Sequence, residues 1–298
     1  MNGTGHLPVL VEEVLRYLDA GREGTYVDCT LGLAGHAAAI LERNPRAILI
    51  GLDRDELSLR RAQERLKPYG DRVRIYHSDF KYLPDLEIDF LAVRGVLLDL
   101  GMSSFQLDSP ERGFSFSLEG PLDMRMDQRS KVTAARILHT YSEPKLAGLF
   151  ASYGELPHTR RLAREVVRLR KLGRLETTTD LRRLVEEVYR WRPQKGKIHP
   201  AARVFQALRI EVNGELDGLG EFLEKTAQLA APGARLVAIS FHSLEDRIVK
   251  HTFAGLADGR DRPPVLGVLT RKPVVPGPRE TAANPRSRSA KLRAAERL

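Results

Sequence analysis

The chain has 298 residues, of which 42% are hydrophobic, so it can bury the core of one large domain or of two unequal ones. A single cysteine, Cys29, excludes an internal disulfide framework and is typical of a reducing cytoplasm. We see no secretory signal peptide, and the apolar runs are strand-sized, so we expect a cytoplasmic protein without a membrane partner.

The net charge of +9 is unevenly distributed along the chain. Residues 104–207 carry 20 Lys and Arg against 12 Asp and Glu, and residues 259–298 carry 10 against 3. The rest of the chain carries 18 against 24 and is therefore acidic. Basic surface attracts polyanions because binding releases their counterions, so the pattern favours a nucleic-acid partner. The alternative is an Arg-rich surface of ion pairs.

Strands and helices alternate over the first hundred residues. Apolar spacing predicts a helix over 9–18, then strands that end near Asp28, Asp53, His77 and Asp99. Helices are predicted between the first three of these strands, over 34–43 and 55–66. This alternation is typical of βαβ units and a parallel sheet.

The alternation stops at about residue 104, and helical patterns dominate the next hundred residues. They cover 132–139, 145–151, 156–172, 179–191 and 200–211. The α/β pattern then resumes with a helix, a strand, a helix and a short strand, over 216–229, 234–241, 243–252 and 265–269.

These patterns predict an α/β, Rossmann-like domain that is interrupted by an inserted all-helical domain. The α/β domain comprises residues 1–103 and 208–298, and the basic, RNA-binding insert comprises residues 104–207. The tail from residue 272 is rich in Pro and Arg, so we expect a basic, extended C-terminal arm.

A glycine-containing loop follows the first predicted strand and reads Asp28-Cys-Thr-Leu-Gly32-Leu-Ala34-Gly35-His36. Glycines allow close approach of the backbone to a ligand, and the following helix adds positive charge. The loop lacks G-x-G-x-x-G, which argues against a dinucleotide oxidoreductase. It resembles the first motif of Rossmann-like methyltransferases, although a purely structural turn stays open.

Asp53 ends the second strand, 21 residues beyond Gly32. A carboxylate at this place accepts hydrogen bonds from ribose hydroxyls, unless it caps the next helix, a role that Asp55 could also fill. Phe80 follows the third strand and could cover an adenine ring, or it could be a core aromatic residue.

Asp99 ends the fourth strand, at the edge where open α/β sheets bind ligands. The small residues after it, including Ser103 and Ser104, leave room for a substrate. Enzymes that methylate amino groups of bases often have Pro-Pro and an aromatic residue here, and this chain does not. The difference argues against a simple DNA amino-methyltransferase.

His242 lies just after the predicted strand over 234–241 and could position or deprotonate an amine. The alternative is a structural His242 with Ser243 as the cap of the next helix. The other histidines show no metal-ligand spacing, so we expect no metal. A basic amphipathic helix carries Arg160, Arg164 and Arg168, which favours contact with RNA phosphates.

Several long blocks, in a fixed order from residue 6 to 293, resemble the ribosomal RNA small-subunit methyltransferase H family (RsmH, also called MraW). Besides the glycine loop, the blocks are His6-Leu-Pro-Val-Leu, Asp99-Leu-Gly-Met-Ser-Ser104, Arg112-Gly-Phe-Ser-Phe, Gly120-Pro-Leu-Asp-Met-Arg-Met-Asp127, His199-Pro-Ala-Ala-Arg-Val-Phe-Gln-Ala-Leu-Arg209, Ser240-Phe-His-Ser-Leu-Glu-Asp-Arg247 and Asn284-Pro-Arg-Ser-Arg288-Ser-Ala-Lys-Leu-Arg293.

The resemblance implies a class I methyltransferase that transfers a methyl group from S-adenosylmethionine to N4 of a cytidine in the decoding region of 16S rRNA. It implies that the substrate is small-subunit rRNA or an assembling 30S particle. By position, the family's cofactor contacts fall on Ala34, Gly35, His36, Asp53, Phe80, Asp99 and Gln106. The family often has Gly where this chain has Ala34.

We expect direct in-line transfer, with Asp99 and His242 as candidate catalytic residues and Ser103, Ser104, Arg160, Arg164, Arg168 and Arg288 as candidate substrate contacts. The base must leave its stack to reach such a site. Two alternatives stay open: an amino-methyltransferase that acts on DNA, and a non-catalytic ribosome-assembly factor that only binds RNA.

Overall fold

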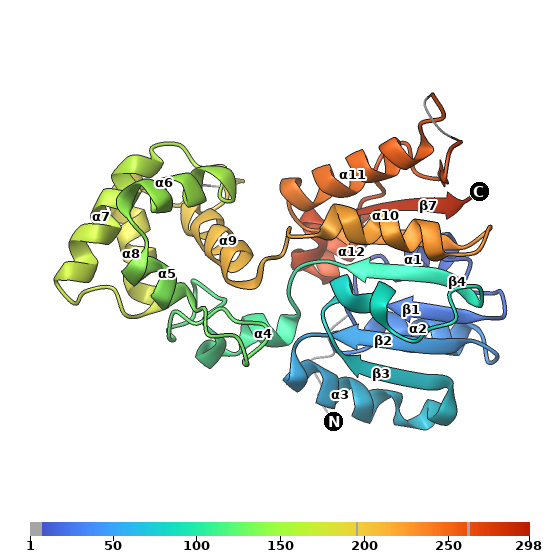
Figure 1. The fold of residues 1–298 in the computed structure, drawn as a ribbon. Helices are drawn as coiled ribbons and strands as arrows, with labels where there is room; N and C mark the ends of the chain where they lie inside the picture. Colours follow the sequence, from blue (N-terminus) through green and yellow to red (C-terminus); the bar gives the residue numbers. More distant parts are fainter. Residues whose placement is uncertain (1–7, 195, 261–262) are drawn as a thin grey trace. The chain divides into compact units, whose positions relative to one another are not determined.

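The computed structural model describes residues 8–194, 196–260 and 263–298. The chain divides into two compact units (Figure 1). The first unit combines Met1–Gly101 with Gly218–Leu298, and the second is the continuous segment Met102–Asp217. The boundary that we predicted at residue 207 falls inside a helix, α9 (Pro200–Asn213), so the second unit extends further than the charge pattern indicated.

The first unit contains a seven-stranded sheet with the order β3-β2-β1-β4-β5-β7-β6. Strands β1 to β5 run parallel to one another, and β7 is antiparallel to both β5 and β6. The strands are β1 (Thr25–Asp28), β2 (Ile48–Asp53), β3 (Val73–His77), β4 (Val93–Asp99), β5 (Arg235–Ser240), β6 (Leu266–Val268) and β7 (Lys291–Arg297). The order reverses between β1 and β4, and open α/β sheets bind ligands outside the carboxyl ends of the strands at such a reversal.

Helices cover both faces of this sheet. Successive residues of a strand point to opposite faces. Tyr26 and Leu97 are therefore buried with helices on one face, whereas Val27 and Leu98 are buried with helices on the other. The first set is α1 (Val11–Tyr17), α2 (Gly35–Arg43) and α3 (Glu56–Leu66), and the second is α10 (Leu219–Leu229) and α11 (Ser243–Ala257). The predicted Rossmann-like α/β architecture is confirmed.

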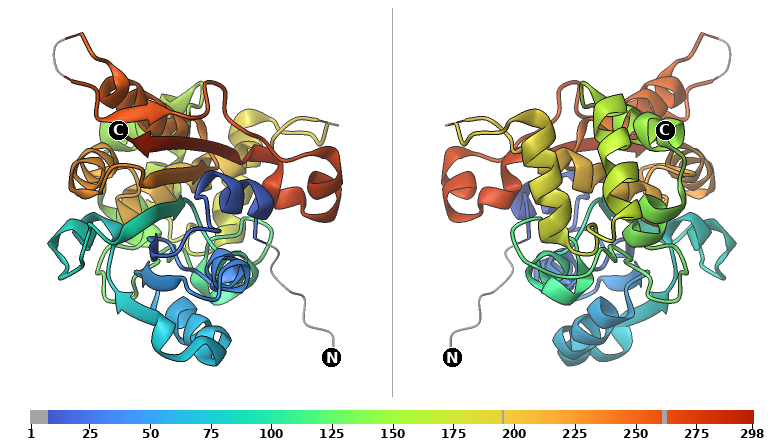
Figure 2. Two further views of the ribbon diagram at one scale, coloured as in Figure 1. Left: turned by 90° about the vertical axis from the view of Figure 1, so that its right-hand side faces the viewer. Right: turned by 90° about the vertical axis from the view of Figure 1, so that its left-hand side faces the viewer.

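The C-terminal segment is part of the sheet, so the predicted extended arm is wrong. Two short helices, α12 (Pro278–Ala283) and η4 (Pro285–Ser289), lead into β7, which is drawn dark red in Figure 2. Ala294 and Ala295 of β7 are buried, and these small side chains fit between the layers. The Arg293 guanidinium lies 2.6 Å from an Asp246 carboxylate oxygen on α11, which neutralises a charge that the sequence pattern assigned to solvent.

The second unit is helical. Its α-helices are α4 (Ser104–Asp108), α5 (Ala134–Thr140), α6 (Glu143–Ser152), α7 (Thr159–Lys171), α8 (Thr178–Tyr189) and α9. Side chains of Ser103, Thr133, Ser142, Thr177 and His199 cap five of them, which is why these helices begin where they do. In the described part of the chain, no helix is both long enough and apolar enough to cross a bilayer.

The long connection before α5 is fixed by its backbone. The Arg112 side chain is buried and donates hydrogen bonds to the carbonyl oxygens of Arg125 and Met126, at 2.9 and 3.1 Å. Gly113 has a φ of +69°, and a Cβ atom there would collide with the carbonyl oxygen of Pro121. Only glycine fits this position, so the irregular segment is a defined structure.

Candidate active site at the carboxyl edge of the sheet

Three aspartates end neighbouring strands at the reversal of strand order. Asp28, Asp53 and Asp99 are the last residues of β1, β2 and β4, and Asp28 pairs in register with Gly51 on one side and Leu97 on the other. Because these strands are parallel, their carboxyl ends meet at one edge of the sheet. The strand ends that the sequence predicted near Asp28, Asp53 and Asp99 therefore lie at the same edge of the sheet.

The glycine loop between β1 and α2 has an unusual backbone. Gly32 and Ala34 have φ values of +51° and +58°, in the left-handed region. For Ala34, which is fully buried, this conformation costs about 1 kcal/mol relative to glycine. A side chain on Gly35 would lie 3.0 Å from Pro8, so the loop has little space for a larger residue.

A hydrogen bond to Asp53 holds this loop against the end of β2. One carboxylate oxygen accepts a hydrogen bond from the Gly32 amide at 2.7 Å, and the other accepts from the Asp55 amide at 2.8 Å. Asp55, not Asp53, caps α3, because its side chain accepts from the Leu57 amide. Each Asp53 oxygen keeps a further lone pair, so the carboxylate can still accept a hydroxyl hydrogen bond.

His36 is buried beside Asp99. Its Nε2 lies 2.8 Å from the carbonyl oxygen of Val9, which can only accept, so Nε2 carries a proton. Its Nδ1 lies 3.6 Å from a carboxylate oxygen of Asp99. Burial lowers the pKa of His36, which favours the neutral ring with an unprotonated Nδ1 facing Asp99.

Burial also makes two of the aspartates hard to ionise. It raises the pKa of Asp28 to about 7, against the opposing effect of His36 and the Thr30 amide. It raises the pKa of Asp99 to about 7, with a further contribution from the negative charge of Glu245. A cation bound at this edge would therefore favour the ionised form of both carboxyl groups.

Asp99 presents an unused acceptor. Its backbone amide donates to the Thr30 hydroxyl at 2.6 Å, which fixes the end of β4 against the glycine loop. Its carboxylate oxygen Oδ1 is buried and has no hydrogen-bond partner among the described residues. Buried polar atoms are normally paired, so an unpaired oxygen at a strand end indicates a place for a ligand group. Thr30 was not singled out in the sequence, although it lies inside the glycine loop motif.

The other predicted cofactor residues have structural roles in the chain. Phe80 is buried in the core, where its ring meets Phe222 edge-on at 5.1 Å. Gln106 belongs to the second unit and forms a capping box with Ser103 at the start of α4. The Gln106 side-chain oxygen accepts from the Ser103 amide at 3.0 Å, and Ser104 is the first residue of this helix.

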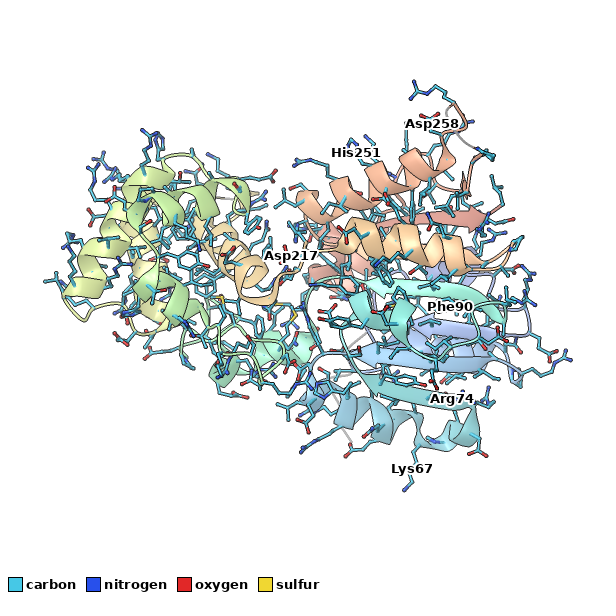
Figure 3. All side chains as sticks on the ribbon, viewed as in Figure 1. Lys67, Arg74, Phe90, Asp217, His251 and Asp258 are labelled. Atoms are coloured by element: carbon cyan, nitrogen blue, oxygen red, sulfur yellow. The ribbon has the colours of Figure 1, made fainter. Side chains whose placement is uncertain are left out.

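His242 caps α11 itself, where the sequence alternative assigned the cap to Ser243. Its Nδ1 accepts from the Glu245 amide at 3.4 Å, and its Nε2 lies 3.2 Å from a Glu245 carboxylate oxygen. The ring is buried, in contrast to the exposed His251 on the same helix (Figure 3). These contacts hold the ring at the start of α11, and its buried Nε2 has no hydrogen-bond partner among the described residues.

The predicted basic residues are exposed. Arg160, Arg164 and Arg168 lie on α7, whose other face buries Leu162 and Val166. Arg164 lies 3.8 Å from Glu143 and Arg168 lies 2.7 Å from Glu165, so each has an acidic neighbour. Arg288 is exposed in η4 of the first unit.

Comparison with known proteins gives extensive matches. A family model described as the MraW methylase family matches residues 3–298. A protein from Cyanothece sp. named ribosomal RNA small subunit methyltransferase H is 49% identical over 293 residues, covering 98% of this chain and 95% of that protein. A protein of the same name from Nitratidesulfovibrio vulgaris is 46% identical over 310 residues, covering 98% and 95%.

Proposed function

Since this chain belongs to the MraW methylase family, we propose that it transfers a methyl group from S-adenosylmethionine to N4 of a cytidine in 16S rRNA. The observation that carries the proposal is the unpaired Asp99 carboxylate oxygen at the carboxyl edge of β4. The proposal includes a cytoplasmic location and a substrate in the decoding region, either free rRNA or an assembling 30S particle.

The residues at the sheet edge suit this cofactor. A sulfonium compound carries a positive charge and a ribose, and it supplies an activated methyl group. Asp53 has open lone pairs for ribose hydroxyls, and the left-handed backbone of Gly32 and Ala34 shapes the loop just before α2. Asp28 and Asp99, whose pKa values burial raises to about 7, favour a cationic ligand. We also assign Phe80 and Gln106 to the cofactor site, as the family resemblance implies.

The chemical problem is the weak nucleophilicity of the cytidine amine, whose lone pair is delocalised into the ring. An acceptor that holds the amine hydrogens favours a tetrahedral nitrogen with a localised lone pair. Asp99 Oδ1 is the buried acceptor at this edge. A pKa near 7 also lets Asp99 take up the proton that the amine loses, because efficient proton transfer needs a pKa close to the working pH.

Positioning supplies the rest of the rate enhancement. When the methyl donor and the amine are held in line, their reaction becomes effectively unimolecular. We assign Ser103, Ser104, Arg160, Arg164, Arg168 and Arg288 to substrate contact. Exposed guanidinium groups bind phosphates of any sequence, which suits a substrate whose target base must be extruded from its stack. We keep His242 as a positioning residue, because it fixes the start of α11.

The test is mass mapping of small-subunit rRNA from cells with and without this protein. We expect one methyl group to be missing from a decoding-region cytidine, and to be restored by the wild type but not by Asp99→Ala. His251→Ala is the matched control for His242→Ala, because His251 is exposed on the same helix.

An unchanged methylation map would contradict the rRNA assignment. Methyl transfer to duplex DNA by the purified protein would then identify a DNA amino-methyltransferase. RNA binding without any transfer would identify an assembly factor.

A further inference from the structure

A row of aromatic rings runs through the second unit from its core to its surface. The buried ring of Phe205 on α9 meets Phe116 edge-on at 5.9 Å. Phe116 stacks on His199 at 5.1 Å with an interplanar angle of 21°. His199 in turn lies 5.2 Å from Trp191, whose indole is only partly buried. We call Phe116, His199 and Trp191 the aromatic row.

Hydrogen bonds hold the aromatic row in place. His199 caps α9, with Nδ1 accepting from the Ala201 amide at 3.1 Å and Nε2 lying 3.2 Å from a Glu186 carboxylate oxygen on α8. Both ring nitrogens therefore have partners, and the ring cannot turn freely. Arg190 ends α8 in the left-handed conformation, and the Trp191 amide donates to the Glu186 carbonyl oxygen at 2.9 Å. This turn places the indole next to His199.

The surroundings of Trp191 are basic. The segment 189–200 contains Arg190, Arg192, Lys195 and Lys197 and no Asp or Glu. Arg190, Arg192 and Lys197 are exposed, and none of the three forms an ion pair with a described carboxylate. The arginines of α7 differ, since Arg164 and Arg168 have acidic neighbours.

We propose that the aromatic row is a stacking site for an unpaired base, and that Arg190, Arg192 and Lys197 bind the flanking phosphates of a single-stranded RNA segment. The partly exposed Trp191 ring meets the fixed ring of His199 at an interplanar angle of 60°, so it loses little side-chain entropy when a base binds. Aromatic faces between cations are the common platform for single-stranded nucleic acid, whereas a duplex has no free base face to offer. This inference rests on the proposed function for its choice of RNA, but it names a recognition site separate from the transfer site.

Trp191 is the one tryptophan of the chain, so its fluorescence reports on this site alone. The full-length protein is titrated with a fluorescein-labelled, unstructured 12-nucleotide RNA, and the same RNA annealed to its complement is the comparison. We expect the single strand to quench Trp191 emission with the same concentration dependence as the rise in label anisotropy. We expect the duplex to bind without quenching.

Three variants separate stacking from charge. Trp191→Ala should weaken binding of the single strand at least about fivefold, and Trp191→Phe should restore most of it, because phenylalanine also stacks. Arg192→Gln should reduce the slope of log K against log salt by about 0.7. Leu91→Ala is the control, since Leu91 is 71% exposed before β4 in the first unit, and it should change nothing.

Single-stranded RNA that binds without changing Trp191 emission would overturn the proposal. Unchanged affinity of Trp191→Ala would also overturn it, as would equal quenching by duplex RNA. None of these measurements requires methyl transfer. A normal methylation map with no Trp191 response would therefore reject this site alone, and a Trp191 response with no rRNA methylation would reject the proposed function alone.

Discussion

The two units use charge in opposite ways. At the carboxyl edge of the sheet, Asp28 and Asp99 are charges taken out of water, and burial raises both pKa values to about 7. In the second unit, Arg160, Arg164 and Arg168 of α7 are exposed to water, as are Arg190, Arg192 and Lys197. Buried charge gives strong, short-range interactions with a small ligand, whereas exposed charge gives salt-sensitive attraction to a polyanion. The first arrangement suits chemistry, and the second suits recognition.

The largest effect should come from removing the unpaired acceptor. Asp99→Asn keeps the size of the side chain but removes its charge and its capacity to take up a proton. We expect single-turnover methyl transfer to fall roughly 100-fold or more, because one pre-positioned electrostatic group typically contributes that much.

The comparison between the units predicts that Asp99→Asn leaves RNA affinity unchanged. Transfer of tritiated methyl groups and anisotropy with labelled RNA would measure the two quantities on the same protein sample. Equal losses in both would show that the sheet edge also holds the RNA.

The stability of the second unit should depend strongly on Gly113. Gly113→Ala forces a Cβ atom against the Pro121 carbonyl and an unfavourable φ of +69° on alanine. We expect a loss of about 3 kcal/mol in unfolding free energy, from the sum of strain and overpacking.

Gly173→Ala is the matched control, because Gly173 has a φ of +61° with open space around its Cα, so only strain of about 1 kcal/mol applies. Guanidinium unfolding followed by circular dichroism measures both. Equal losses for the two variants would mean that the connection 113–132 can move aside.

The sequence predicted the sheet edge better than it predicted the second unit's surface. Asp53 and Asp99 each end an apolar run, and parallel pairing brings such ends together whatever the intervening chain does. The aromatic row escaped notice because Phe116 and Trp191 are far apart in the sequence, and their proximity depends on the packing of α8 and α9.

Composition misled the prediction for the C-terminal segment. Pro and Arg indicated a solvated arm, but β7 is held by contacts with distant residues. Arg293 meets Asp246, and the backbone of β7 pairs with β5. Single-sequence patterns carry no information on such non-local partners. At the start of α11, the sequence alternative assigned the cap to Ser243, whereas the structure shows His242 in that place.

Cofactor affinity should depend on pH through the buried aspartates. The groups around the site are Asp28, His36, Asp53, Asp99 and Glu245. A sulfonium ligand binds the ionised form of Asp99 better than the protonated form. Because the pKa of Asp99 is about 7 without ligand, affinity should fall as the pH falls from 8 to 6, by roughly tenfold if one group controls it.

Calorimetric titration at pH 6, 7 and 8 checks this dependence, with uptake or release of protons read from buffers of different ionisation enthalpy. S-adenosylhomocysteine is the matched ligand, since it lacks the sulfonium charge and should show a weaker dependence. In Asp99→Asn the dependence on pH should shrink. An equal dependence for both ligands would place the effect on a group that does not face the sulfur.

The smallest effect should come from the exposed arginines of α7, because each is one of many cations that a polyanion can use. The double variant Arg160→Gln, Arg164→Gln should weaken RNA binding about fivefold at low salt and change methyl-donor affinity not at all. Since Arg164 has Glu143 as a neighbour, part of its charge is already compensated, and Arg160 should contribute more than Arg164. The two single variants therefore compare a compensated arginine with one that no described carboxylate compensates, on the same helix. Binding measured over a range of salt concentrations separates the two arginines, and a larger loss for Arg164 would mean that RNA displaces Glu143 from its partner.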